Sequence, residues 1–321
     1  MYVILMKRKI IKQGNGTLTM TLPRQWAREV GLSGESEIEI VVDENHLIVS
    51  PVGEINKKEI TINVDNFQRL AFAKFLIACY EQGVDTMDLR FSKKTSKSWS
   101  HGHEDVADVI QFFTNRLVGF EVLSQTKNSI KIGNISEKHV KFENIVSRIF
   151  FLLEEYVDHL ADALSTNDHA ILKDGENRHD NIAKLVALSL RMIHESKTIS
   201  NVNALNMHTV LHTVDKVADF FRYTYRYAMP HKRKVSKTTI RLVKKVRDFI
   251  EQYRHFFNKF SYDEIGTLDS LRGEVKGLFL LQMKKHPSEG TITYSLNAAV
   301  ETLHGAIKPR ISIELDKNKF V

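Results

Sequence analysis

The sequence predicts a multidomain α+β protein: a short β-rich head, a small α/β module and a long all-helical region. In the head, apolar residues alternate with threonines in short runs bounded by glycine and proline. Strand and helix patterns then alternate, and from Phe142 onward the apolar spacing is helical throughout. A length of 321 residues fits two or three domains. The expected domains are residues 1–54, 55–137 and 138–321.

Composition is that of a globular protein with a sizeable core, with 42% hydrophobic and 26% charged residues. The single Cys79 lies in an apolar helical run, where a buried, unreactive thiol is expected. One cysteine excludes an intramolecular disulfide framework and fits a reducing compartment. No apolar run reaches the length of a transmembrane segment, and Met1–Met6 is too short for a signal peptide. We therefore expect a cytoplasmic protein.

The head reads as short strands around one short helix. The expected elements are a strand at 8–13, a turn at 14–16, a strand at 17–22, a helix from Pro23 to about Val30, and a hairpin of 37–42 with 46–49. Gly31 is expected to end the helix, and Pro51 with Gly53 to close the domain.

Positive charge is concentrated at the start of the chain. The net charge is +7, and six basic residues precede the first acid, Glu29. They are Lys7, Arg8, Lys9, Lys12, Arg24 and Arg28. Side chains of this kind neutralise DNA phosphates, so we expect these six to contact DNA. The alternative is a dimerisation cap with solvated basic residues, and the acids Glu35, Glu37 and Glu39 favour it slightly.

Four short motifs give the head a resemblance to a known family. They are KIIKQGNG at 9–16, TMTLP at 19–23, VGL at 30–32 and LIVSP at 47–51. The segment resembles the swapped-hairpin DNA-binding domain of the AbrB/SpoVT family. The resemblance implies that two chains interleave into one small β-barrel that presents basic side chains to DNA. A homodimer also makes physical sense, since fewer than 50 residues bury little core alone.

Residues 57–136 are expected to form a small α/β linker or dimer-supporting module. The predicted elements are strands at 60–64 and 86–91, helices at 67–80 and 103–117, and a closing hairpin of 120–124 with 130–132. The polar stretch 93–102 is expected to be a loop. His101 and His103, beside Glu104 and Asp105, suit either a metal site or a polar helix cap, and the cap is favoured.

Six helices are predicted in the C-terminal region. They are 142–164, 168–197 (with a possible break at Gly175), 202–227, 238–260, 268–284 and 291–311. Two sets of three suggest an internal repeat of antiparallel three-helix bundles. The basic run between Arg222 and Arg247 is either a solvated helix face or a surface for nucleic acid, anionic lipid or an acidic protein.

Two carboxylate pairs stand out on these helices. Glu176 with Asp180, and Asp215 with Asp219, are each four residues apart and share one helix face. Like charges at this spacing are unfavourable unless a positive group lies between them, and a bound metal ion would supply it. Carboxylate ligands suit Mg, Mn or Fe, and added imidazoles would favour Zn. The alternative is two solvated helix faces with an accidental spacing.

The two motifs, with the sequence TVDKVAD at 213–219, give this region a resemblance to the PhoU family of phosphate-uptake regulators. Together with the head, the chain resembles archaeal-type phosphate uptake regulators. The resemblance implies a cluster of Fe, Zn, Mg or Mn held by Glu176, Asp180, Asp215 and Asp219. The second repeat departs from the pattern: the segment 301–305 offers only Glu301 and His304, and Asp269 and Glu274 have the wrong spacing. A weak or absent second site is expected there.

These observations predict a non-enzymatic, homodimeric DNA-binding regulator of phosphate uptake, whose metal-binding bundle modulates the head. One alternative is an adaptor that acts on a phosphate ABC transporter or a sensor kinase and uses the head only to dimerise. Another is a helical metalloenzyme, a di-metal oxidase or phosphohydrolase. The enzyme is disfavoured because the two motifs are pairs of acids four residues apart and no general acid or base in a pocket is evident, so no catalytic residue is assigned.

Overall fold

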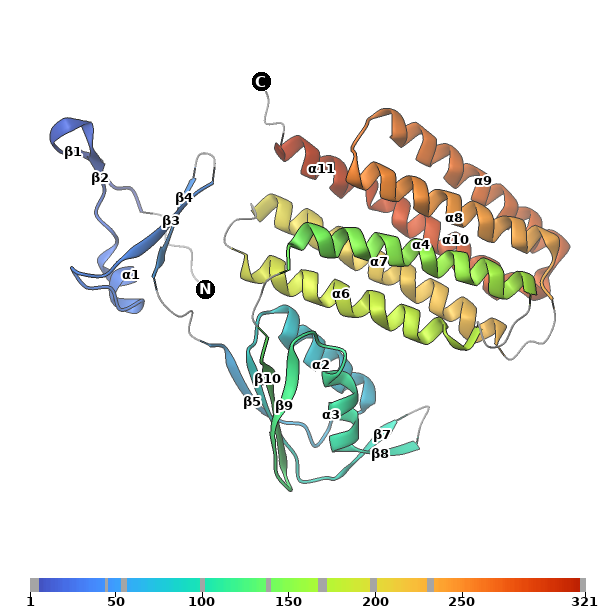
Figure 1. Cartoon of the computed structure of the whole chain (residues 1–321), viewed down its shortest axis with the longest axis horizontal. Helices are drawn as coiled ribbons and strands as arrows, with labels where there is room; N and C mark the ends of the chain where they lie inside the picture. The colour runs from blue at the N-terminus through green and yellow to red at the C-terminus, as the bar shows by residue number, and fades with distance from the viewer. Residues whose placement is uncertain are drawn as a thin grey trace. The chain divides into compact units, whose positions relative to one another are not determined.

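The computed structural model divides the chain into two compact units, Met1–Asn56 and Lys57–Val321 (Figure 1). The described residues are 6–43, 46–52, 57–98, 102–136, 140–166, 172–196, 201–229 and 234–317. The division lies close to the expected domain boundary after residue 54, whereas the boundary expected after residue 137 falls inside the second unit. Within the described ranges, no helix is both long and apolar enough to cross a membrane.

The first unit contains two separate antiparallel ribbons and one short helix. Its elements are β1 (Ile11–Lys12), η1 (Gly14–Gly16), β2 (Leu18–Thr19), α1 (Arg24–Glu29), β3 (Ile38–Asp43) and β4 (His46–Pro51). β1 pairs with β2, and β3 with β4. Gly31 follows α1 at φ +73°, a left-handed conformation that glycine adopts at little cost. The tip of the second ribbon, Glu44 and Asn45, lies outside the described residues.

This unit has no hydrophobic core of its own. Each of its side chains that the structure describes is exposed or half-buried. Large apolar side chains face solvent: Ile10 is 65% exposed, Leu18 64% and Val42 72%. No closed barrel forms from these described ribbons. A small β domain in this state needs another surface to cover its apolar residues.

The second unit begins with an α/β module. Its elements are β5 (Glu59–Asn63), α2 (Arg69–Glu81), β6 (Thr86–Arg90), β7 (Thr95–Ser98), β8 (Gly102–Asp105), α3 (Val106–Thr114), β9 (Phe120–Gln125) and β10 (Ser129–Asn134). The four-stranded sheet has the order β5-β6-β10-β9, with β5 and β6 parallel. Helices α2 and α3 cover one face of this sheet (Figure 1). Cys79 is half-buried, not buried as expected, and burial raises the pKa of its thiol.

The expected loop at 93–102 is wrong for most of its described residues, because Thr95–Ser98 and Gly102 are strand. β7 pairs antiparallel with β8, from Thr95 opposite Asp105 to Ser98 opposite Gly102. Its polar sequence lacks the apolar alternation that signals a strand, so backbone pairing alone defines it. Helix α3 consequently starts at Val106, later than expected. Asp105 caps it by accepting a 2.7 Å hydrogen bond from the Ala107 amide, which confirms the predicted polar cap.

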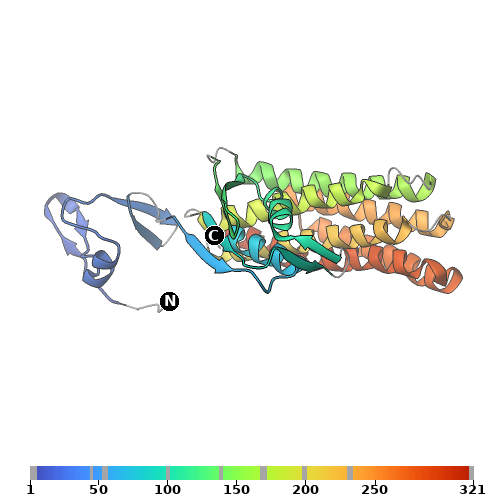
Figure 2. The same cartoon turned by 90° about the horizontal axis from the view of Figure 1, so that it is seen from below.

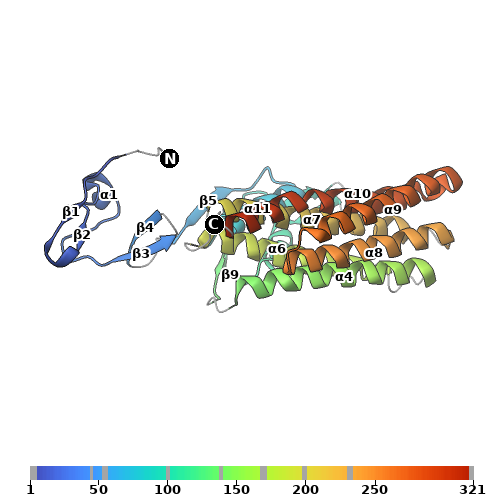
Figure 3. The ribbon, with the colours of Figure 1, turned by 90° about the horizontal axis from the view of Figure 1, so that it is seen from above.

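The remaining helices run side by side in a bundle (Figures 2 and 3). They are α4 (Phe142–Thr166), α6 (Gly175–Glu195), α7 (Asn201–Ala228), α8 (Lys237–Asn258), α9 (Asp263–Lys285), α10 (Gly290–Gly305) and α11 (Ile307–Lys317). α4, α6 and α7 pack together, as do α8, α9 and α10, and the two groups meet where α4 packs on α8 and α7 on α10. The last expected helix is broken at Ala306, and its second part, α11, packs against α7.

Helix α6 joins the α/β module to the bundle. Ala187 and Leu188 contribute to the apolar core of the module. Beside them, the Arg191 side chain is 2% exposed and donates to the carbonyls of Tyr80 (3.0 Å) and Val84 (2.7 Å). It also pairs with Asp85 and Glu195, each at 2.9 Å. These contacts explain why the expected second and third domains form one unit.

Candidate functional site

The six basic residues predicted to contact DNA are all exposed in the first unit. Arg24 and Arg28 lie four residues apart on α1 and so point from the same face of the helix. None of the six forms an ion pair with any residue that the structure describes. Their charges are therefore available to an external anion.

Three of the four predicted metal ligands, Glu176, Asp180 and Asp219, are paired with cations of the chain itself. Glu176 accepts two hydrogen bonds from Arg226, at 2.5 and 2.9 Å. Asp180 pairs with Arg116, which lies just beyond the end of α3. Asp219 pairs with Arg222 one turn along α7 and with Lys216 at 3.2 Å.

His179 connects the two carboxylate motifs. It is 6% exposed, with Nδ1 3.0 Å from Asp180 and Nε2 3.3 Å from Asp219. Burial alone would lower the pKa of His179, but the hydrogen bonds to the two aspartates raise it above its usual value. Likewise, burial would raise the pKa of Asp219, but His179, Arg222 and Lys216 bring it down to about 2. The His179 imidazole, which lies between the two carboxylates, is the centre of this cluster.

Two more acids complete the cluster, which we call the carboxylate cluster: Glu81, His179, Asp180, Asp215 and Asp219. Burial raises the pKa of Asp215, and the neighbouring charge of Asp219 adds to the effect. Burial also raises the pKa of Glu81 to about 7, with a further contribution from Asp215. Glu81 is the last residue of α2, so the α/β module supplies an acid to a site formed mainly by α6 and α7.

The observed arrangement does not suit a metal ion without rearrangement. No three His, Cys, Asp or Glu side chains among the described residues are placed to hold one. The oxygen donors are of the right chemical kind, but Arg116, Arg222 and Arg226 already supply positive charge to three of them, Asp180, Asp219 and Glu176. The metal expected from the sequence stays a prediction.

The corresponding acids of the second helix group also have an arginine partner. Arg272 lies 2.8 Å from Glu301 and 3.7 Å from Asp269. His304 lies 3.4 Å from Asp269, and Glu274 pairs instead with Lys245 at 3.0 Å. In both groups, therefore, an arginine pairs with an acid that was considered as a metal ligand, although only a weak or absent site was expected in the second group.

Much of the basic run between Arg222 and Arg247 serves the bundle internally. Besides Arg222, Arg226 and Lys245, Arg247 pairs with Asp158 at 3.1 Å and with Glu251. Lys232 and Arg233 lie outside the described residues. Half of the described part of this run is thus neutralised, whereas its other members are exposed and form no ion pair with a described residue: Lys234, Lys237, Arg241 and Lys244.

Several residues in or next to the carboxylate cluster were not predicted from the sequence as part of a site. Arg222 is three residues after Asp219, so an ion pair along the helix was a readable signal. No local pattern pointed to Arg116 or Glu81, because they come from another part of the chain. His179 stood within the motif but had no assigned role.

The raised pKa of Glu81 predicts how stability depends on pH. In the unfolded chain this carboxyl titrates near 4.5, and in the folded chain near 7. The folded state therefore favours the protonated form, and this contribution to stability is lost as pH rises from 4.5 through 7. Glu81→Gln is expected to raise the free energy of unfolding at pH 8 by about 1–2 kcal/mol, discounted for partial exposure, with little effect at pH 5.

Urea unfolding of the full chain at both pH values measures this difference. The exposed Glu121→Gln on β9 is the matched control and should change stability equally little at both. A Glu81→Gln effect that is the same at pH 5 and pH 8 would contradict the assignment. The pKa of His179 is also raised, and its effect on the free energy of unfolding has the same sign in the wild type and in both variants.

Comparison with known proteins identifies the first unit. Residues 11–57 match the model of a family described as antidote-toxin recognition MazE, bacterial antitoxin. No curated protein matches the chain. The matched segment contains β1 to β4 and α1, the elements that carry the resemblance to swapped-hairpin domains. The N-terminal head is a MazE/AbrB-like domain.

Proposed function

We propose that the protein is a homodimeric DNA-binding regulator. One observation carries the proposal: a MazE/AbrB-like domain presents six exposed cations with no ion-pair partner among the described residues. Those six, Lys7, Arg8, Lys9, Lys12, Arg24 and Arg28, would contact DNA phosphates. The dimer follows from the apolar surface of the same domain, which a second copy would cover to form one shared core.

The second unit would act as the regulatory part. Two packed groups of three helices, with the acidic motifs on α6 and α7, support a PhoU-like role in phosphate uptake. A phosphate ABC transporter or a sensor kinase would then be a protein partner. We assign no catalytic activity to the chain.

The experiment is binding of the full chain to a phosphate-transport promoter fragment and to random DNA of equal length, across a salt series. Preference for the promoter fragment, with affinity falling as salt rises, supports a sequence-specific regulator. Dimerisation without DNA binding would favour the alternative function, an adaptor that acts on a transporter or kinase and uses the head only to dimerise. The description of the matched family favours a second candidate, an antitoxin-type head that binds a toxin protein, and co-purification with a co-expressed toxin protein tests it.

Metal binding by the carboxylate cluster is tested by removing Arg222, which pairs with Asp219. A metal ion at Asp219 must displace Arg222, so Arg222→Ala is expected to strengthen metal affinity roughly tenfold. The measurement is the rise in Tm of chelator-treated full chain on adding Mn, Zn or Fe, since a ligand of the native state stabilises it. Arg254→Ala removes a similar arginine, paired with Glu154 at 2.6 Å, and is the matched control.

If Asp180→Asn/Asp219→Asn left the rise in Tm unchanged, the metal ion would bind at a site other than the carboxylate cluster. Equal rises in Tm in Arg222→Ala and Arg254→Ala would show that Arg222 does not compete with a metal ion.

A further inference from the structure

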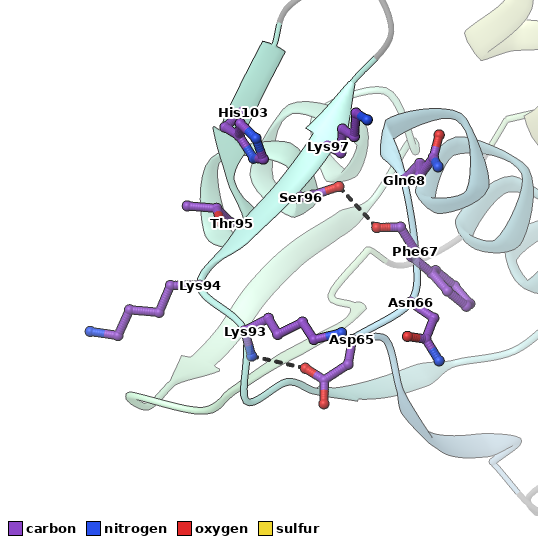
Figure 4. Close-up of a pocket in the computed structure, with 10 residues that line it drawn as sticks. All are labelled: Asp65, Asn66, Phe67, Gln68, Lys93, Lys94, Thr95, Ser96, Lys97 and His103. Atoms are coloured by element: carbon purple, nitrogen blue, oxygen red, sulfur yellow. Dashed lines mark hydrogen bonds between the residues drawn. The ribbon is translucent and has the colours of Figure 1, made fainter.

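A pocket of about 550 Å³ opens on the surface of the α/β module (Figure 4). Residues 65–68, which lead into α2, form one side of it, and residues 93–97 with His103 form the other. Its volume is in the range of small-molecule sites. Neither the DNA-binding head nor the carboxylate cluster contributes to it.

The lining carries an excess of positive charge. Lys93, Lys94 and Lys97 are exposed, and their ammonium groups form no ion pair with a described residue. Two nearby arginines, by contrast, do form ion pairs: Arg69 pairs with Glu104 at 2.5 Å, and Arg90 pairs with Asp88 at 2.9 Å. Lys93 and Lys97, both uncompensated, therefore give this concave surface a preference for an anionic ligand.

Asp65 is the single acid of the lining, and its role is structural. Its carboxylate accepts hydrogen bonds from the Lys93 amide (2.9 Å), the Ser92 amide (2.6 Å) and the Ser92 hydroxyl (2.8 Å). A further bond comes from the Asn63 amide group at 3.1 Å. These bonds hold the pKa of Asp65 well below its usual range and join the two sides of the pocket.

The pocket walls are held in place by the strand framework. The Ser96 side chain is 5% exposed and donates a 2.9 Å hydrogen bond to the Phe67 carbonyl (Figure 4). β7 is also paired along its length with β8. Gln68, the N-cap of α2, lines the pocket without a side-chain cap hydrogen bond, so the positive end of that helix adds to the potential.

We propose that this pocket binds a small molecule bearing a phosphoryl group, with Lys93 and Lys97 as its main electrostatic contacts. A polar, open lining in which Phe67 is the one large apolar side chain suits a compact, multiply charged anion. Lys94 provides an internal control, because its side chain points away from the other labelled residues (Figure 4). The inference goes beyond the proposed function and stands independently of DNA binding.

Calorimetric titration of the full chain at constant ionic strength tests the proposal. The probes are inorganic phosphate, pyrophosphate and ATP, with sulfate for comparison. At least one phosphoryl probe should bind once per chain and more tightly than sulfate. Lys93→Ala/Lys97→Ala should weaken it more than about tenfold, and Lys94→Ala less than about threefold. Tight binding of pyrophosphate or phosphate points to a free phosphate, whereas binding of ATP alone points to a nucleotide.

Three results would overturn the proposal: absence of millimolar or tighter binding by every phosphoryl probe, sulfate binding of equal strength, or an equal loss in Lys94→Ala. Competition by a short DNA duplex that depends on Lys93 and Lys97 would assign the surface to nucleic acid instead. Unchanged circular dichroism and Tm would show that the variants are folded. Arg24→Ala/Arg28→Ala should bind the phosphoryl probe normally, which separates this test from that of the head.

Discussion

Arg24→Ala/Arg28→Ala is expected to weaken DNA binding by on the order of 100-fold at physiological ionic strength. Both side chains are exposed on one face of α1 and have no ion-pair partner among the described residues. In a homodimer the two substitutions remove four positive charges from the DNA-binding surface. Because each phosphate contact releases about one counterion, the salt slope should fall by roughly four.

The measurement is fluorescence anisotropy with labelled duplex DNA across a salt series. Lys276→Ala/Lys284→Ala, two exposed lysines of α9, removes the same charge from the second unit and should leave binding nearly unchanged. Arg24→Lys/Arg28→Lys retains the charge and should restore most of the salt slope. Wild-type affinity in the double alanine variant would exclude α1 from the DNA contact and favour the adaptor.

Arg191→Met is expected to lower the free energy of unfolding by about 3 kcal/mol. The guanidinium is 2% exposed and satisfies the carbonyls of Tyr80 and Val84 together with Asp85 and Glu195. Methionine fills similar space but leaves these acceptors without their donor in a water-poor interface. Asp85 retains its hydrogen bond from the Lys58 amide at 3.1 Å and is partly solvated, which limits the loss.

Urea unfolding of the full chain measures this loss. Arg90→Met is the matched control: it removes an arginine that is 63% exposed and paired with Asp88, and should cost less than about 1 kcal/mol. Hydrogen exchange should also show faster opening where α2 meets α6 in Arg191→Met alone. Equal stability of the two variants would mean that Arg191 does not hold the module to the bundle.

Elements with an apolar stripe were predictable from sequence. The sequence of α7 carries an apolar stripe at helical spacing, and all five of its residues are fully buried: Val210, Leu211, Val214, Val217 and Phe221. The spacing of such residues reports which face of a helix is covered, and the predicted limits of α4, α7 and α8 lie within two residues of those observed. β7 and β8 have no such stripe. Their residues pair through backbone groups that every sequence shares, and this hairpin was therefore missed.

The sequence by itself determined the order of the modules, the helical character of the long C-terminal region and the exposed basic residues of the head. These properties depend on local periodicity and charge, which the chain carries wherever it folds. The tertiary structure alone decided which groups from distant parts of the chain meet the acids of α6 and α7. Arg116 and Glu81 reach them from the α/β module, because Arg191 and the apolar face of α6 hold that module in place. Contacts between distant segments follow from packing, and packing is not encoded in any short stretch of sequence.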